Sequence, residues 1–402
     1  MCDMTGPAKK KTALQGALTA TAAILTIAAF SSGLLYLDRL IDRPLVASPA
    51  NAAGSIQADA KVRALLAERI DKHKQGVGIV VGIVGPKGRS VVSHGKFGIA
   101  DPRPVDGDTL FEIGSITKVF TAMLLADMAE RGEVALNDPV ARYLPEDVTV
   151  PGRDGKTISF TDLATHMSGL PRLPDNLAPA DDANPYADYT TQQLYAFVSG
   201  YILPRRIGAE YEYSNLGFGL LGHALARRAG VDYATLVRLR ITDPLGMSST
   251  AITLTPDLAK RMARGHGSAL AGVPNWDLPT LAGAGALRSS VNDLLVFLEM
   301  ALGQRQTPRA VRLSKTLATT LATRRQITDG GATALGWVVT TNATGEVIWH
   351  NGGTGGFSSF IAFHPRTKVG VVILSNTNVG IEDIGVQVLR SLVLPANGPI
   401  PG

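Results

Sequence analysis

The stretch GVGIVVGIVG, residues 76–85, sets the expectation for the fold, because its apolar and β-branched residues predict a strand. After the turn PKG, a second strand-like run, RSVVSHGKFGIA, covers residues 89–100. Four further strand patterns lie near the other end of the chain: ALGWVVTT (334–341), EVIWH (346–350), FSSFIAFHP (357–365) and VGVVILSN (369–376). Strands at both ends with helices between them indicate one sheet that the two ends build together.

Helical spacing of apolar residues predicts the elements that surround this sheet. The clearest patterns span residues 53–74, 119–132, 215–230, 291–303 and 381–394. We therefore expect one lobe built on this sheet, with the terminal helices covering its faces, and a second lobe formed by the helical middle of the chain. The expected boundaries are a catalytic domain over 53–395, with a sheet lobe at about 53–115 and 330–395, a helical lobe at about 120–300, and a tail over 396–402.

Composition limits the classes of function. The 402 residues carry a net charge of only +5 and no basic stripe with interleaved aromatic residues, so we expect no nucleic-acid partner. The single cysteine, Cys2, excludes an internal disulfide. Seven scattered histidines, without a His-Glu-x-x-His motif or a cysteine pair, predict neither a metal site nor a cofactor.

Residues 1–52 have the pattern of a cytoplasmic stub, a membrane segment and a linker. Three lysines, Lys9 to Lys11, precede an uncharged run over residues 12–37, which is long enough to span a bilayer as a helix. The alternative is a cleaved secretory signal, but its best cleavage site, ANAA at 50–53, lies far beyond the apolar run. We favour the uncleaved anchor. Both alternatives place the catalytic part on the periplasmic or extracellular side, because the lysines stay in the cytoplasm.

The stretch FEIGSITKVF, residues 111–120, contains the first candidate for catalysis. Ser115 stands where a helix begins, so it is either an ordinary helix N-cap or a nucleophile. Lys118 would lie one turn along the same helical face, where burial could lower its pKa and make it a base. The same spacing occurs in Ser93 and Lys96, but within a strand pattern, and we interpret that second pair as a coincidence.

Two further segments contain the residues that a serine nucleophile would need. In EYEYSNLGFG, the order Tyr213, Ser214, Asn215 precedes a helix, so Asn215 is either an N-cap or a group that grips a substrate amide. Beside a lysine ammonium, the Tyr213 phenol would ionise more easily and could carry a proton. In WHNGGTGGFSSF, residues 349–360, the glycines form either a bulge or a strand edge that admits substrate and offers a backbone N–H to an oxyanion.

In this order, the three segments resemble those of the serine β-lactamase and penicillin-binding protein superfamily. The branch that they resemble contains class C β-lactamases, D-alanyl-D-alanine carboxypeptidases and related esterases. The resemblance covers about residues 58–392 and extends to LATHMSGLP (163–171), DPLGMSST (243–250), GAGALRSSVNDLLVF (283–297) and VVILSN (371–376). It implies a β-lactamase/transpeptidase-like fold of the α+β class, in which an α/β sandwich lobe with an antiparallel sheet is joined to an all-helical lobe.

The resemblance also implies a role for each site residue. Ser115 would be the acylated nucleophile, and Lys118 and Tyr213 would handle its proton. The oxyanion hole would consist of the backbone N–H groups of Ser115 and Gly353. Substrate would be bound by four further residues: Asn215, His350, Gly352 and Thr354.

One departure from the family pattern leaves the substrate open. Class C β-lactamases carry Lys-Thr-Gly where this chain has His350, Asn351 and Gly352. Histidine is mostly neutral at pH 7, so it lacks the fixed charge that steers a substrate carboxylate. The expected function is a serine hydrolase of β-lactams or D-Ala-D-Ala-type cell-wall peptides. A carboxylesterase and a non-catalytic binding protein are the alternatives, and the sequence does not reveal the rate of deacylation.

Overall fold

The structure is a computed structural model that describes residues 54–328 and 330–393. The predicted anchor over 12–37, the linker up to residue 52 and the tail over 396–402 lie outside the described residues. Within the described ranges, no helix is both long and apolar enough to cross a membrane.

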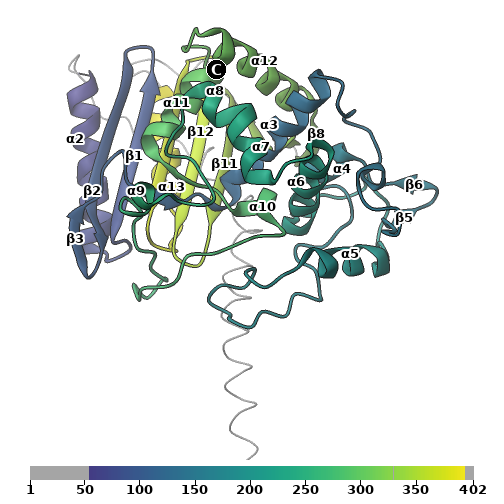
Figure 1. Cartoon of the computed structure of the whole chain (residues 1–402). Coiled ribbons are helices and arrows are strands. Elements are labelled where there is room, and N and C mark those ends of the chain that lie inside the picture. The colour runs from purple at the N-terminus through teal and green to yellow at the C-terminus, as the bar shows by residue number, and fades with distance from the viewer. Residues whose placement is uncertain (1–53, 329, 394–402) are drawn as a thin grey trace, which may run out of the picture. The chain divides into compact units, whose positions relative to one another are not determined.

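One antiparallel sheet of nine strands forms the centre of the described fold, in the order β3-β2-β1-β13-β12-β11-β10-β9-β8 (Figure 1). Strand β1 pairs with β13, and Val81 lies opposite Ile373, so the prediction of one sheet built from both ends is confirmed. Nearly every residue of β1, β12 and β13 is buried, which explains their continuous apolar sequences. The strands are β1 (Gly78–Gly85), β2 (Gly88–Gly98), β3 (Asp101–Pro104), β8 (Arg325–Thr328), β9 (Gly331–Ala334), β10 (Trp337–Asn342), β11 (Gly345–Gly353), β12 (Ser358–His364) and β13 (Val369–Ser375).

Helices cover both faces of the sheet. On one face lie α2 (Gly54–Ala67), which the short η1 (Glu68–Lys72) extends, and α13 (Glu382–Val393). Gly385 of α13 approaches so closely that an added Cβ would lie 2.3 Å from the ring of Phe360 in β12. On the other face α11 (Val291–Ala301) packs on β1, where a Cβ at Gly82 would lie 2.5 Å from Val291. The expected α/β sandwich is therefore observed.

The middle of the chain is mostly helical and contains two small two-stranded sheets. Helix α12 was not predicted, although Thr307 followed by Pro308 is a helix-start signal and the Thr307 hydroxyl accepts the N–H of Ala310. The elements are β4 (Leu110–Glu112), η2 (Gly114–Ile116), α3 (Thr117–Glu130), η3 (Val140–Tyr143), β5 (Gly152–Arg153), β6 (Lys156–Thr157), α4 (Phe160–Ala164), α5 (Thr191–Gly200), α6 (Asn215–Ala229), α7 (Tyr233–Val237), η4 (Arg238–Thr242), α8 (Asp243–Leu245), α9 (Pro256–Ala259), α10 (Ala282–Gly285), β7 (Arg288–Ser290) and α12 (Pro308–Ala322).

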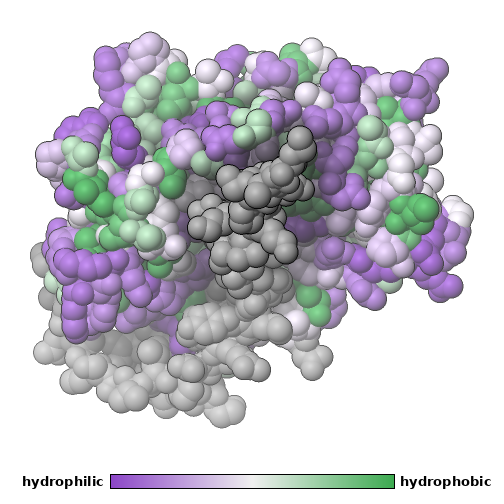
Figure 2. Space-filling view, turned by 90° about the horizontal axis from the view of Figure 1, so that it is seen from below, coloured by the Kyte–Doolittle hydropathy of each residue, from purple (hydrophilic) through white to green (hydrophobic). Residues whose placement is uncertain are grey.

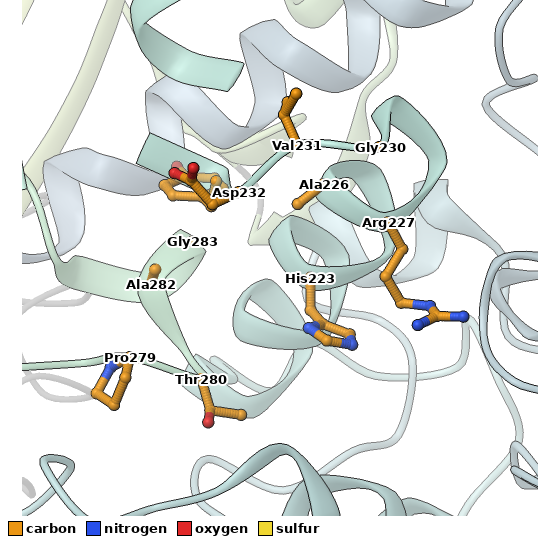
Figure 3. A pocket seen from close by; sticks show the side chains of 11 residues that line it. His223, Ala226, Arg227, Gly230, Val231, Asp232, Pro279, Thr280, Ala282 and Gly283 are labelled. Atoms are coloured by element: carbon orange, nitrogen blue, oxygen red, sulfur yellow. The ribbon is translucent and has the colours of Figure 1, made fainter. Parts of the chain in front are cut away.

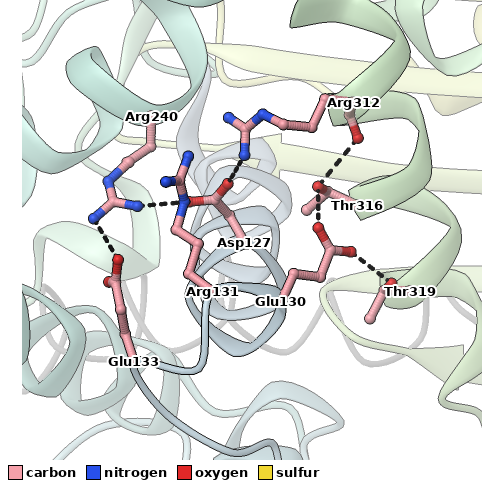
Figure 4. A network of polar contacts seen from close by, with 8 residues as sticks. All are labelled: Asp127, Glu130, Arg131, Glu133, Arg240, Arg312, Thr316 and Thr319. Atoms are coloured by element: carbon pink, nitrogen blue, oxygen red, sulfur yellow. Dashed lines mark hydrogen bonds and ion pairs between the residues drawn. The ribbon is translucent and has the colours of Figure 1, made fainter.

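Helix α3 is buried along almost its whole length, because other elements surround it. Near its C-terminal end, the fully buried carboxylate of Asp127 binds three arginines (Figure 4). Arg131 follows on α3 itself at 2.9 Å, Arg240 of η4 approaches to 3.1 Å, and Arg312 of α12 completes the group. The carboxylate thus ties three elements together around one buried charge.

The coloured part of the face in Figure 2 is mostly hydrophilic, and hydrophobic residues lie among the polar ones in small groups. Among the described residues, large apolar side chains that stay exposed include Ile99, Leu239 and Ile202. Scattered exposure of this kind is ordinary on the exterior of a globular protein.

Candidate active site

Ser115 lies in the short turn η2, immediately before α3 begins at Thr117. No side-chain hydrogen bond caps either element, so the interpretation of Ser115 as an N-cap is wrong. Gly114 before it has φ +48°, a left-handed conformation that favours glycine. The turn leaves the Ser115 side chain half-buried and free of any capping role.

Lys118 follows in the first turn of α3 and is fully buried. Its Nζ lies 3.0 Å from Ser115 Oγ, 2.8 Å from Asn215 Oδ1 and 2.7 Å from the carbonyl oxygen of Ala284. Within the described part of the chain, no carboxylate forms an ion pair with it. Burial, and then the nearby positive charge of Arg172, lower the pKa of Lys118 well below its ordinary value, as expected for a base.

The side chain of Asn215 can contact Lys118 because Ser214, and not Asn215, caps helix α6. The Ser214 hydroxyl accepts the N–H of Gly217, so Ser214 is the N-cap and Asn215 is the first residue of the helix. The alternative in which Asn215 is the cap is therefore wrong. Its side chain extends to Lys118 through Oδ1, and its Nδ2 lies 3.5 Å from the hydroxyl of Tyr186.

The side chain of Tyr213 lies beside the lysine, with Lys118 Nζ 4.8 Å from the centre of its ring. The residue is partly exposed, but its hydroxyl oxygen is buried and has no partner at full hydrogen-bond distance among the described residues. Burial raises the pKa of Tyr213 to about 12, although the Ser115 hydroxyl is near enough to offset part of the rise. The expectation of an easily ionised phenol is thus wrong, because desolvation outweighs the neighbouring positive charge.

His166, in the LATHMSGLP segment, positions Tyr213, a role that the sequence did not reveal. Its ring stacks on that of Tyr213 with centroids 4.4 Å apart. Its Nδ1 accepts the N–H of Ser214 at 3.0 Å, and its carbonyl accepts the N–H of Glu212. Burial lowers the pKa of His166 well below its usual value, so the ring stays neutral. The only signal in the sequence is the position of this histidine in a segment that resembles the family.

Strand β11 passes directly beside the nucleophile. A Cβ at Gly352 would lie 2.2 Å from the Ile113 carbonyl oxygen and 2.9 Å from the Ser115 nitrogen. A Cβ at Gly114 would lie 2.7 Å from the nitrogen of Gly353. These glycines therefore allow the strand and the turn to touch, which brings the backbone N–H groups of Ser115 and Gly353 to one place. The predicted role of Gly352 in contacting substrate has no support in this packing.

His350 and Asn351 point to opposite faces of β11. His350 is buried, its Nδ1–H donates to the Asn351 carbonyl at 2.6 Å, and its ring lies 6.4 Å from that of Tyr213. Burial and the Lys118 charge lower the pKa of His350 to about 3, so this position is neutral. Asn351 instead donates to Glu382 at the start of α13 and does not face the site.

Thr354 lies just beyond the strand, next to the buried carboxylate of Glu112. Its hydroxyl makes no hydrogen bond of full strength within the described residues, but it is close enough to lower the pKa of Glu112 against the larger effect of burial, which raises it. Arg288 lies 3.5 Å from the same carboxylate. Thr354 therefore follows directly after the strand that passes Ser115, and its hydroxyl lies close to a buried carboxylate of the protein itself.

The second serine-lysine pair lies in a strand, as predicted. Ser93 and Lys96 belong to strand β2, with Gly95 at φ +91° between them. Lys96 Nζ donates to the carbonyl of Ile99. A strand cannot stack two such side chains along one face, so this pair has no means of activating a hydroxyl.

A separate cavity of about 370 Å³ lies beside α10 and is lined by residues that include His223, Arg227 and Asp232 (Figure 3). Ala282 and Gly283 of α10 form part of its wall, and the next residue, Ala284, accepts the hydrogen bond of Lys118. None of the site residues described above lines this cavity.

Comparison with known proteins identifies relatives over most of the chain. The Beta-lactamase family matches residues 58–388. The D-alanyl-D-alanine-carboxypeptidase/endopeptidase AmpH of Escherichia coli strain K12 is 30% identical over an alignment of 312 positions, which covers 72% of this chain and 80% of that protein.

Solved structures show the same fold. A class C beta-lactamase from Rhodobacter sphaeroides has a TM-score of 0.71 and 29% identity, over 84% of this chain and 98% of that one. A beta-lactamase/D-alanine carboxypeptidase from Yersinia pestis complexed with citrate has a TM-score of 0.70 and 26% identity, over 85% and 100%. The predicted α+β class is confirmed.

Proposed function

This chain belongs to the Beta-lactamase family and is a serine hydrolase, and from that premise we propose that it forms an acyl-enzyme at Ser115 with β-lactams or D-Ala-D-Ala-type peptides. The observation that carries the proposal is the environment of Lys118. This amine is fully buried 3.0 Å from Ser115 Oγ, and its other two contacts are neutral acceptors. Such an environment favours a neutral amine, which is the form that can act as a base.

The two N–H groups and the lone pair of a neutral Lys118 amine can be assigned to its three contacts in one arrangement. A neutral amine has two N–H groups, which donate to Asn215 Oδ1 and to the Ala284 carbonyl in the two shorter contacts. Its lone pair then faces Ser115 and accepts the hydroxyl proton. As Ser115 Oγ attacks the substrate carbonyl, that proton moves to Lys118, and the carbonyl oxygen becomes an oxyanion held by the N–H groups of Ser115 and Gly353.

Collapse of the tetrahedral intermediate needs a proton on the leaving nitrogen. Tyr213 stays protonated because its pKa is about 12, and its buried hydroxyl lies on the Ser115 side of the site. In the proposed step the phenol donates its proton to the leaving nitrogen as the C–N bond breaks, and the Lys118 ammonium reprotonates it. Water then attacks the ester by the same route, and Ser115 regains its proton.

The second candidate is a carboxylesterase of the same fold, and the neutral position 350 favours it. Burial lowers the pKa of His350 to about 3, so the strand offers no fixed charge to a substrate carboxylate. An ester substrate needs no such charge. The acyl-enzyme chemistry of Ser115 would be the same in both cases.

The N-terminal pattern supports a location in the cell envelope. Lysines at positions 9 to 11, followed by the uncharged run over 12–37, are typical of a segment that leaves the following domain on the outer side of the membrane. We propose that residues 12–37 anchor the enzyme in the membrane, where cell-wall peptides are within reach.

Intact-mass analysis of the protein over time with benzylpenicillin tests this function. A lasting adduct at Ser115 indicates slow deacylation and a penicillin-binding or peptidase role, whereas a transient adduct with accumulation of the opened drug indicates a β-lactamase. Ser115→Ala is the control and should remain folded without any adduct. A folded wild-type protein that forms no adduct would contradict the proposal and favour the esterase.

A further inference from the structure

The strand beside the nucleophile lacks a permanent positive charge. His350 is neutral, and β10, β11 and β12 contain no lysine or arginine. Substrates of the proposed class carry carboxylates, which bind best to a fixed cation. None of these three strands can supply such a cation.

Arg172 occupies such a position, on the loop that follows the LATHMSGLP segment. Its carbonyl accepts the N–H groups of Asn215 and Leu216 at 3.0 and 3.2 Å, so the loop is tied to the start of α6. Its guanidinium carbon lies 5.1 Å from the centre of the Tyr213 ring. The side chain is half-buried.

The positive charge of Arg172 affects the pKa values of the catalytic groups. It contributes to lowering the pKa of Lys118 and opposes the effect of burial on the pKa of Tyr213. It acts in the same way on Tyr186, whose hydroxyl lies 3.5 Å from Asn215 Nδ2. The side chain of Arg172 therefore lies near Tyr213, Lys118 and Tyr186, and its backbone carbonyl holds the loop at Asn215.

We propose that Arg172 binds a carboxylate on the part of the substrate that lies next to Asn215, and that the enzyme thereby prefers acyl groups that carry a negative charge. The proposal rests on the proposed acyl-enzyme function and specifies its substrate class. Arginine suits this role because its planar guanidinium can donate two parallel N–H bonds to one carboxylate and stays charged at every working pH. Asn215 would bind the neighbouring amide, so the side chains of Arg172 and Asn215 together would recognise an acyl chain that carries a negative charge.

The test compares benzylpenicillin with α-carboxybenzylpenicillin, which differ by one carboxylate on the acyl side chain. The acylation rate constant at Ser115 is measured for both by intact mass, and their ratio is the readout. Arg172→Gln should lower the preference for the carboxylated drug about tenfold or more, as expected for loss of a charge-assisted contact. Arg172→Lys should keep a large part of the preference, since it keeps the charge.

The ratio separates recognition from positioning. A variant that only disturbed Lys118 or Asn215 would slow both drugs equally and leave the ratio unchanged, which would overturn the inference while the proposed function stood. Absence of any adduct with either drug in the folded wild-type protein would overturn both. Arg206→Gln is the matched control, because Arg206 is 81% exposed and pairs with Asp154, and its ratio should equal that of the wild type.

Discussion

The two ends of helix α3 each bury one charged residue type, in opposite surroundings. Among the described residues, the hydrogen-bond partners of Lys118 in the first turn are all neutral: a hydroxyl, an amide oxygen and a backbone carbonyl. Asp127, near the other end, is equally inaccessible but is surrounded by Arg131, Arg240 and Arg312. Helix α3 therefore buries one ionisable group, Lys118, that has no oppositely charged partner among the described residues. It buries a second group, Asp127, that has three such partners.

The difference separates function from stability. A buried amine without a carboxylate partner pays a desolvation penalty for its charge, which lowers its pKa and makes a base available at neutral pH. A buried carboxylate among arginines keeps its charge and joins α3, η4 and α12, and removal of one member would leave other charges uncompensated. The comparison yields four predictions, given from the largest expected effect to the smallest.

Lys118→Met should abolish most of the activity without loss of stability. We expect acylation by benzylpenicillin to fall about 10³-fold, the usual contribution of a general base. The free energy of unfolding at pH 7 should equal or exceed that of the wild type, because methionine removes an amine that is costly to bury. Acylation kinetics and urea unfolding measure both quantities, and a clear loss of stability would show that the lysine is structural.

Asp127→Asn should have the opposite effect. The change leaves three arginines facing a neutral amide, and we expect a loss of about 3 kcal/mol in the free energy of unfolding, the low end for such a site. The low end applies because the Arg131, Arg240 and Arg312 side chains are 41%, 22% and 40% exposed. The fraction that remains folded should be acylated at the wild-type rate, and a large drop in that rate would refute the division between the two ends.

The pH dependence of stability should reveal the depressed pKa of Lys118. Between that pKa and the ordinary value near 10.4, the unfolded chain binds a proton that the folded protein does not, so this residue makes stability rise with pH. Lys118→Met lacks this contribution. Its stability advantage over the wild type should therefore shrink from pH 7 to pH 9, as measured by urea unfolding at both values. An advantage that is the same at both pH values would mean that the folded lysine is charged.

Lys96→Ala should change almost nothing. Lys96 lies on strand β2, and its Nζ donates to the backbone carbonyl of Ile99. We expect acylation within about twofold of the wild type and stability within about 0.5 kcal/mol, as for ordinary surface positions. A large loss of acylation would show that the serine-lysine pair in this strand, and not Ser115 with Lys118, takes part in the reaction.

Local sequence patterns predicted the elements well where their cause is local. The apolar runs at 76–85 and 369–376 became the paired strands β1 and β13, and the pattern over 215–230 became α6. Patterns failed where two neighbouring residues compete for one role. Ser115 and Asn215 are both residue types that often cap helices. In the structure, however, Ser214 caps α6 and no side chain caps α3. Which hydroxyl or amide finds a backbone N–H depends on the path of the chain around it.

The sequence by itself determined the family, the order of the motifs and the identity of Ser115, Lys118 and Tyr213 as the site to examine. These depend on residue type and spacing, which are written in the chain. Only the tertiary structure decided the state of each group. Burial lowered the pKa of Lys118 and raised that of Tyr213 to about 12. Likewise, Arg172 came to lie beside Tyr213 through contacts between distant segments. Desolvation and the distance between charges arise when the fold excludes water, and no single stretch of sequence specifies them.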